Sequence, residues 1–420
     1  MKPGLWRHRD FVLLWGGQTV SEMGSAVTQL ALPLIAVVLL KASTFEVGLL
    51  TSAATLAFAT IALPAGAIVD RHAKRRLMIA CDAARLLIVA SVPLAWVAGV
   101  LTMGQLYGVA VAAGVCTVFF DVAYQSYLPS LLAAEHLIDA NGKLQTTASL
   151  AQLLGPGLGG GLVGAFGAAG AMTADAVSYA VSVASLLGIR HREEPQVRDD
   201  TAPRRSLRAE VAEGLSFVVR HPILRKVVAC TGTANLFNSI ATAVEILFLI
   251  RVLHVHPAYV GLLFAIAAVG GIIGGLTAGW FARRIGSARI IWVSILVFSI
   301  PGMLPALAEP GWLVVLYPVG FAFEFFAAVL YNVAQVSYRQ AICPPHLLGR
   351  MNAATRWIVW GTMPLGGLIG GALGTAIGLR PTLAIGLVGS WAAGLFVFFS
   401  PLRTMRDVPA AEKEPAPQEA

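Results

Sequence analysis

Twelve long apolar segments dominate this chain and limit the folds that it can adopt. Each holds the roughly 20 mostly apolar residues that a helix needs to cross about 30 Å of hydrocarbon. A helix satisfies its own backbone hydrogen bonds in lipid, so the expected fold is an all-α bundle of twelve transmembrane helices. The segments are Phe11–Leu40, Val47–Val69, Leu77–Ala98, Leu106–Leu128, Leu144–Phe166, Ala171–Ile189, Ile223–Ile250, Val260–Ala282, Ile290–Leu307, Trp312–Gln340, Asn352–Ile377 and Thr382–Leu402.

The charge content requires lipid around most of the surface. Only 12% of the residues are charged, whereas a soluble domain carries about 25%. The net charge of +8 does not indicate a nucleic-acid partner, because the cations lie in short loops where they report orientation. One set of loops is basic and holds Arg71, Lys74, Arg75, Arg76, Lys143, the cluster from Arg190 to Lys226, Arg283, Arg284, Arg289 and Arg350. The positive-inside rule therefore predicts that these loops and both termini are cytosolic.

A repeat divides the chain into two related halves. The basic turn Gly66–Arg76 returns in reduced form at Gly279–Arg289, and the lead-ins Val47–Leu50 and Val260–Leu263 match as well. Two related halves in a membrane protein are typical of transporters. We expect six-helix halves at residues 1–190 and 222–402, a cytosolic linker at 191–221 and a disordered tail at 403–420. Within the linker, apolar spacing predicts a surface helix at Arg208–Arg220.

Acidic residues inside the apolar segments are the main functional candidates. Such groups are costly at membrane depth and by default mark a functional site. Two of them belong to polar stripes with helical spacing, which should face the bundle interior. One stripe is Gln18, Glu22, Ser25 and Gln29, and the other is Asn235, Asn238, Thr242 and Glu245; Asp121 and Glu324 lie in segments 4 and 10. The sequence predicts that Glu22, Glu245 and Glu324 bind protons or cargo.

Structural alternatives remain for several charged residues. Glu245 could instead form a salt bridge with Arg251, and Asp121 could pair with Arg71 or Arg75. Asp82 and Arg85, three residues apart on one helix, should neutralise each other, and Asp175 should be solvated near the outer face. The aromatic candidates for stacking on a cargo are Tyr124, Phe237 and Tyr331, although most aromatic residues should serve packing.

Glycine and proline predict close helix packing at two places. Small residues let helices approach closely in lipid, and a proline bends a helix by removing a backbone hydrogen bond. A hinge role in addition to packing is left open. The residues are Gly155, Pro156, Gly159 and Gly160 in the first half and Pro364, Gly366 and Gly367 in the second.

Three groups of residues carry a resemblance to the major facilitator superfamily. Gly66-xxx-Asp70-Arg71-x-Ala73-x-Arg75-Arg76 resembles its loop 2–3 signature, although that pattern prefers glycine at Ala73. Gly155-Pro156-xx-Gly159-Gly160 is similar to the motif of its exporters. The runs beginning at Arg9, Leu347 and Pro364 resemble the bacterial branch of macrolide-efflux and enterobactin-exporter-like proteins.

The resemblance implies a function and assigns roles. It implies a central cavity lined by segments 1, 4, 7 and 10, and a gate formed by Gly66, Asp70, Arg71, Arg75, Asp121 and Arg356. Without the resemblance, the basic residues of this group would indicate only a positively charged loop that fixes the orientation of the chain in the membrane. Cavity or proton-coupling roles fall to Gln18, Glu22, Gln29, Tyr124, Asn238, Glu245, Glu324 and Tyr331.

The sequence thus predicts a secondary transporter and not an enzyme. It carries no phosphate loop, catalytic triad or metal-ligand spacing, so we expect no cofactor and no metal. The predicted activity is proton-driven export of a small apolar or amphipathic compound, of drug, antibiotic or siderophore type. A monomer in the bacterial inner membrane is expected, with cargo, protons and lipid as partners. An uptake symporter, or a non-transporting scramblase or sensor, is the alternative.

Overall fold

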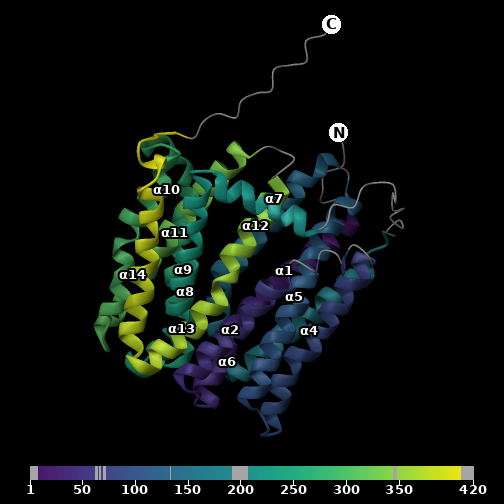
Figure 1. The fold of residues 1–420 in the computed structure, drawn as a ribbon. Helices are drawn as coiled ribbons and strands as arrows, with labels where there is room; N and C mark the ends of the chain where they lie inside the picture. Colours follow the sequence, from purple (N-terminus) through teal and green to yellow (C-terminus); the bar gives the residue numbers. More distant parts are fainter. Residues whose placement is uncertain are drawn as a thin grey trace.

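The computed structural model describes residues 8–61, 65, 68–69, 72–132, 134–191, 207–343 and 348–407. Within these ranges the regular elements are helical and form two bundles side by side, with both termini at the same end (Figure 1). We call that end the terminal end and the opposite one the distal end. The tail beyond residue 407, most of the linker, and Gly66, Asp70 and Arg71 lie outside the described residues.

The first bundle begins with α1, which ends in a π-helical turn, and closes with a long bent helix. Its elements are α1 (Arg9–Leu34), η2 (Ile35–Leu39), α2 (Thr44–Thr60), α4 (Lys74–Val97), α5 (Met103–Leu131) and α6 (Ala134–Gly188). Gly167 breaks α6 with a φ of +71°, a value that glycine adopts at little cost. The two arms of α6 correspond to the predicted segments 5 and 6.

The second bundle follows the same plan after a short amphipathic helix. Residues Leu207–Arg220 form α7, which confirms the predicted helix in the linker. The other elements are α8 (Leu224–Leu247), η3 (Phe248–Val252), α9 (Pro257–Ile285), α10 (Arg289–Val293), η4 (Ser294–Phe298), η5 (Ile300–Leu307), η6 (Trp312–Val315), α11 (Leu316–Ile342), α12 (Leu348–Gly361), α13 (Met363–Ala376), α14 (Leu379–Phe398) and η8 (Pro401–Arg403).

The number of membrane passes agrees with the prediction. Ten helices in the described ranges are long and apolar enough to cross a membrane. Among these α6 counts once, although its two arms make two passes, and α2 is a shorter apolar helix. The described chain therefore makes the twelve passes that hydropathy predicts. An interior made largely of aliphatic side chains fills each bundle.

Glycines bring the two bundles together near the distal end. A Cβ atom added to Gly48 of α2 would lie 2.5 Å from the Cα atom of Gly371, and one added to Gly160 of α6 would lie 2.5 Å from that of Gly261. Such separations exclude any side chain. The Ser52 hydroxyl donates to the Pro364 carbonyl at 2.7 Å and adds a polar contact between α2 and α13.

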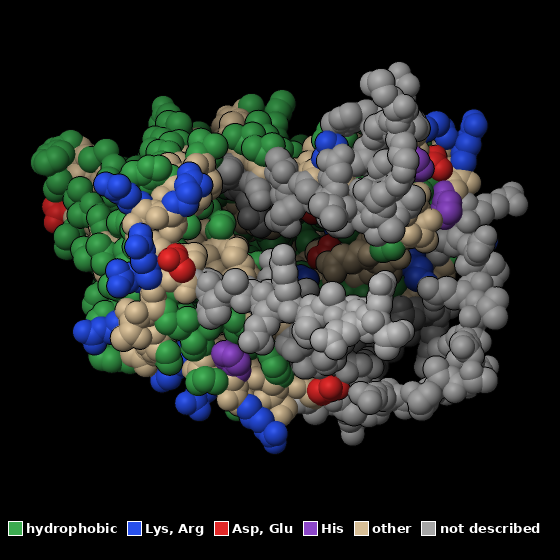
Figure 2. Space-filling view, turned by 90° about the horizontal axis from the view of Figure 1, so that it is seen from above, with side chains coloured by type: hydrophobic (Ala, Val, Ile, Leu, Met, Phe, Trp, Pro, Cys, Tyr) green, Lys and Arg blue, Asp and Glu red, His purple; other side chains and the backbone are tan. Residues whose placement is uncertain are grey.

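The predicted packing glycines serve two kinds of contact. Gly155 and Gly159 lie against α1 in their own bundle, and Gly366 lies against α8 in the other. Gly160 and Gly367 face the opposite bundle. Viewed from the terminal end, the molecule is hollowed near its centre (Figure 2). The described structure therefore combines glycine contacts near the distal end with a hollow that opens toward the terminal end.

Candidate functional site

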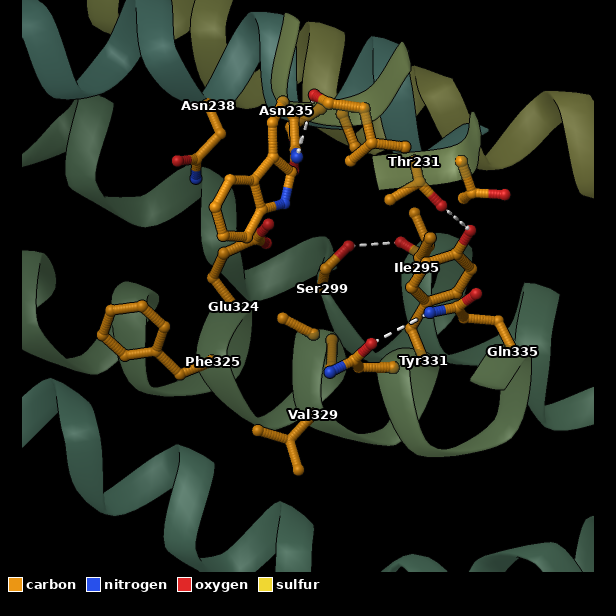
Figure 3. Close-up of a pocket in the computed structure, with 18 of the residues that line it drawn as sticks. Thr231, Asn235, Asn238, Ile295, Ser299, Glu324, Phe325, Val329, Tyr331 and Gln335 are labelled. Atoms are coloured by element: carbon orange, nitrogen blue, oxygen red, sulfur yellow. Dashed lines mark hydrogen bonds between the residues drawn. The ribbon is translucent and has the colours of Figure 1, made fainter. Parts of the chain in front are cut away.

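A cavity of about 440 Å³, lined by both polar and apolar side chains, lies in the second bundle. This volume is within the range of pockets that hold small-molecule ligands. Elements α8, α11 and α12 supply most of its wall (Figure 3). The predicted site residues Asn238, Glu324, Tyr331 and Arg356 meet here, and so does Asn235 of the predicted stripe. The wall also holds residues that the predictions did not include: Thr231, Asn332, Gln335, Arg339, Thr355, Trp360 and Ser390.

Glu324 is the acidic group of this cavity wall. It lies on α11, and its carboxylate interacts with Ser390 of α14. A glycine in η5 allows the approach, because a Cβ atom added to Gly302 would lie 2.7 Å from Glu324 Oε2. Both Glu324 and Asn238 line the cavity (Figure 3). The cavity thus holds one carboxylate with room beside it.

The other polar groups of the wall are partly engaged with one another. The Tyr331 and Thr231 hydroxyls lie 2.7 Å apart, and Tyr331 also donates to the Val227 carbonyl at 3.2 Å. Gln335 donates through Nε2 to Asn332 Oδ1 at 2.9 Å. Tyr331 therefore contributes its ring to the cavity wall, while its hydroxyl forms hydrogen bonds with α8.

Glu245 lies outside this cavity although it belongs to the same predicted stripe. Its carboxylate is buried and accepts a hydrogen bond from the Tyr317 hydroxyl of α11. The predicted alternative of a salt bridge to Arg251 is wrong, because Arg251 donates to the Ala42 carbonyl of the first bundle. Thr242 is exposed. The stripe on α8 thus divides between the cavity and a buried contact with α11.

The first bundle holds a second cluster of acids. The Gln18 amide donates to Glu22 Oε1 at 2.8 Å. Asp121 of α5 lies within electrostatic range of Glu22 and of Arg356 from the other bundle. Tyr124 interacts with the same two acids and stacks on Phe120 with ring centroids 6.2 Å apart. Gln29 lies further along α1 and is exposed. Its side chain has no described contact with this cluster.

Arg85 is the cation of this cluster. It forms an ion pair with Asp82, which confirms the predicted pairing, and its guanidinium lies 4.6 Å from the ring centroids of both Phe120 and Tyr179. Asp82 also accepts from the Ser182 hydroxyl of α6 at 2.5 Å. This network fixes α4, α5 and the second arm of α6 around one buried positive charge.

The prediction that Asp175 is solvated is wrong. Its side chain has no exposed surface, and it accepts hydrogen bonds from Thr28 at 2.5 Å and from Ser178 at 3.0 Å. The hydropathy pattern placed it near the end of a segment, but the turn at Gly167 brings it against α1. Sequence spacing alone does not reveal such a contact between helices.

The gating residues are only partly described. Arg75 donates to the backbone carbonyls of Leu186 and Leu187, at 2.8 and 2.9 Å, where α6 ends. Asp121 interacts instead with Arg85 and Arg356, so its predicted pairing with Arg75 is not found, and Arg71 lies outside the described residues. Arg356 stacks over Trp360 at 4.7 Å.

Phe237 packs against Gly389 of α14 and is not part of the cavity wall, contrary to the prediction.

Neither cluster resembles a metal centre. In the described ranges, no group of three or more His, Cys, Asp or Glu side chains is placed so that it could hold a metal ion. The site instead consists of a polar cavity in one bundle and a network of acids around Arg85 in the other, with Asp121 and Arg356 as the electrostatic connection between them.

Comparison with known proteins agrees with this architecture. The family model described as transmembrane secretion effector matches residues 4–420. The multidrug efflux pump Tap of Mycolicibacterium fortuitum is 27% identical over 91% of this chain and 93% of its own length. The enterobactin exporter EntS of Citrobacter koseri is 22% identical, with 91% and 90% covered.

A solved structure shares the fold. The nucleoside transporter NupG superposes with a TM-score of 0.70 at 12% identity and covers 93% of this chain and 97% of its own. The relatives are membrane transporters and not enzymes. The chain therefore belongs to the transmembrane secretion effector family of the major facilitator superfamily, and is a transporter of small molecules.

Proposed function

We propose that this protein exports a small amphipathic compound in exchange for protons. The observation that carries the proposal is the group of acids in the first bundle. At membrane depth Glu22, Asp82, Asp121 and Asp175 lie around Arg85, and Asp121 is also within range of Arg356. A buried charge without a partner is costly, so four carboxyl groups near two described cations leave about two that need a proton or a bound cation for neutrality.

Proton exchange by Glu22 is the simplest use of this excess of acids. Its partner Gln18 is neutral, and Arg85 is already engaged with Asp82. A proton bound at Glu22 on one side of the membrane and released on the other would couple proton entry to the alternation of access. Asp121 interacts electrostatically with both Glu22 and Arg356. A change in the charge of Glu22 would therefore alter the interaction of Asp121 with the second bundle, which holds the cargo cavity.

The direction of transport and the orientation belong to the same proposal. The relatives named as an efflux pump and an exporter support export. Basic residues are concentrated at the terminal end, which supports a cytosolic position for both termini in the bacterial inner membrane. In the described conformation the hollow would then face the cytosol and admit cargo from it.

Proton-driven flux in proteoliposomes tests the proposal. Vesicles with an imposed pH gradient should move a fluorescent amphipathic compound against its gradient, and a protonophore should abolish that movement. Glu22→Gln should retain passive exchange of the compound but lose the acceleration by the gradient. Glu309→Gln is the matched control, because Glu309 is exposed outside the helices. Normal pH dependence in Glu22→Gln would remove Glu22 from the coupling role, and sodium dependence would replace protons as the coupled ion.

A further inference from the structure

The cavity in the second bundle is lined by one acid, Glu324, and by two cations, Arg339 and Arg356. Glu324 and Arg339 both line it and lie on α11, separated by steps of seven, four and four residues through Tyr331 and Gln335. These steps keep all four side chains on one face of a helix. At a rise of 1.5 Å per residue, the backbone positions of Glu324 and Arg339 are about 22 Å apart along the axis. The Arg339 side chain is within electrostatic range of Tyr331, so the two charged groups are closer together than their backbones. The cavity therefore has an acid toward one end and a base toward the other.

Two polar atoms of the cavity wall are unpartnered in the described structure. Thr355 has 4% of its surface exposed and lines the cavity, and its hydroxyl has no hydrogen-bond partner. The Nε atom of Arg339, which also lines the cavity, has none either. Buried polar groups are normally paired, and each exception requires an explanation. Both groups can donate a hydrogen bond, so they suit an acceptor such as a carboxylate.

The wall between the two ends carries side-chain amides. Asn235, Asn332 and Gln335 lie along it, and Gln335 is 4% exposed. Side-chain amides offer both donors and acceptors, which match the hydrogen-bonding groups of a cargo better than a purely apolar surface does. The aromatic rings of Phe325 and Trp360 add apolar contact. This distribution disfavours a compound that is apolar throughout.

We propose that the cargo is an elongated zwitterion, with an amine bound at Glu324, a carboxylate bound at Arg339 and Thr355, and hydrogen-bonding groups between them. The inference rests on the proposed transport function and specifies its cargo class. Glu324, held by Ser390, would attract the cationic end, and Arg339 would bind the anionic end through its unpartnered Nε.

A peptide with four combinations of end groups provides the test. A five-residue peptide extends about 17 Å, and side chains that reach into the cavity shorten the distance it has to cover. Acetylation removes the positive charge and amidation removes the negative one. The free peptide, each singly capped form and the doubly capped form are titrated into the purified full-length protein, and Kd is measured by calorimetry. The free peptide should bind at least about ten-fold more tightly than either singly capped form, because each cap removes a charge-assisted hydrogen bond.

Three variants assign the ends. Glu324→Gln should remove the advantage of the free amine and leave that of the free carboxylate. Thr355→Val, which keeps the side-chain volume, and Arg339→Gln should do the opposite, and Glu309→Gln should change neither. Equal affinity of the doubly capped and free peptides, preference for the amidated cation, or no binding by any of the four would overturn the zwitterion proposal. Proton-driven flux of another compound alongside such a result would leave the proposed function intact, whereas absence of proton-driven flux with zwitterion preference would refute only the coupling.

Discussion

Single residues in the first bundle show how a charge is kept at membrane depth. Arg85 is 4% exposed, and its ion pair with Asp82 replaces part of the hydration that it loses. Phe120 and Tyr179 cover the two faces of the guanidinium, an arrangement that suits the planar cation of arginine. The pair therefore depends on four side chains from three helices, and the sequence spacing of Asp82 and Arg85 identifies only two of them.

Removal of Arg85 should destabilise the protein strongly. Arg85→Ala leaves Asp82 buried without its countercharge, which costs about 3–5 kcal/mol in other proteins. Arg85→Lys should be intermediate, since it keeps the charge but loses the planar stacking. Unfolding of the detergent-solubilised protein measures the difference. A double variant, Asp82→Asn with Arg85→Gln, should recover part of the loss; if the double variant is no more stable than Arg85→Ala, the ion pair is not the cause.

His221 gives a pH-dependent prediction outside the membrane. Its Nδ1 accepts hydrogen bonds from the backbone NH groups of Ile223 and Leu224, where α8 begins, at 3.3 and 3.2 Å. Burial lowers the pKa of this imidazole below its ordinary value of 6.5. The neutral ring therefore contributes stability that is complete above pH 6.5 and is lost as the pH falls toward the lowered pKa.

Asparagine in place of His221 tests that contribution. His221→Asn retains an acceptor at a position that covers a helix start but cannot titrate. Its unfolding midpoint should therefore fall less than that of the parent protein between pH 7 and pH 5, each compared at the same ionic strength. Parallel midpoints in the two proteins over this range would show that His221 does not titrate in the folded state with a lowered pKa.

At the scale of elements, the repeat in the sequence corresponds to paired contacts in space. The lead-in glycines Gly48 and Gly261, which reveal the repeat, occupy equivalent positions in α2 and α9. Each meets a glycine of the opposite bundle, Gly371 in α13 and Gly160 in α6. Both pairs allow backbones to touch, as small residues do between membrane helices. The repeated sequence therefore includes residues at which the two halves contact each other, in addition to residues that define the shared fold.

Neighbouring glycines in α6 provide a matched pair of variants for this contact. A Cβ atom at Gly160 would come 2.5 Å from Gly261 Cα, whereas one at Gly161 meets no atom within 4 Å. Gly160→Ala should weaken the distal contact and reduce transport at least several-fold, and Gly161→Ala should leave transport near the parent rate. Flux in proteoliposomes at equal protein content measures both. Equal activity of the two variants would mean that the distal contact does not limit the transport cycle.

Sequence alone predicted the helices better than their contacts. Hydropathy identified all twelve passes because lipid imposes a length and a composition on each. Asp175 and Phe237 were misplaced, since their environment depends on which helix packs beside them. The cavity groups Gln335, Arg339 and Thr355 lie near the terminal-end portions of α11 and α12, where polar residues also occur for reasons of solvation. Only the packing of three helices distinguishes them from ordinary surface residues.

At the scale of the whole molecule, the two clusters divide the work between the bundles. The acids around Arg85 belong to the first bundle and the cargo cavity to the second. Tight glycine contacts near the distal end, with a hollow at the terminal end (Figure 2), suit a rocking motion of two nearly rigid bundles. At these glycine contacts the helix backbones of the two bundles touch directly. The distal side can therefore open only if the two bundles move apart there.

This motion predicts on which side the cavity can be labelled. Asn238 is exposed in the cavity, so a cysteine at this position, with the native cysteines replaced, should react with a membrane-impermeant thiol reagent applied from the terminal side. Adding Gly160→Ala should raise its reactivity from the distal side, because the weakened contact favours the opposite conformation. A cysteine at Trp312, which is 80% exposed at the start of η6, serves as the control and should react from the distal side in both backgrounds. Labelling of position 238 from the distal side in the parent, or no change with Gly160→Ala, would contradict the assignment of the glycine contacts as the closed end of the transporter.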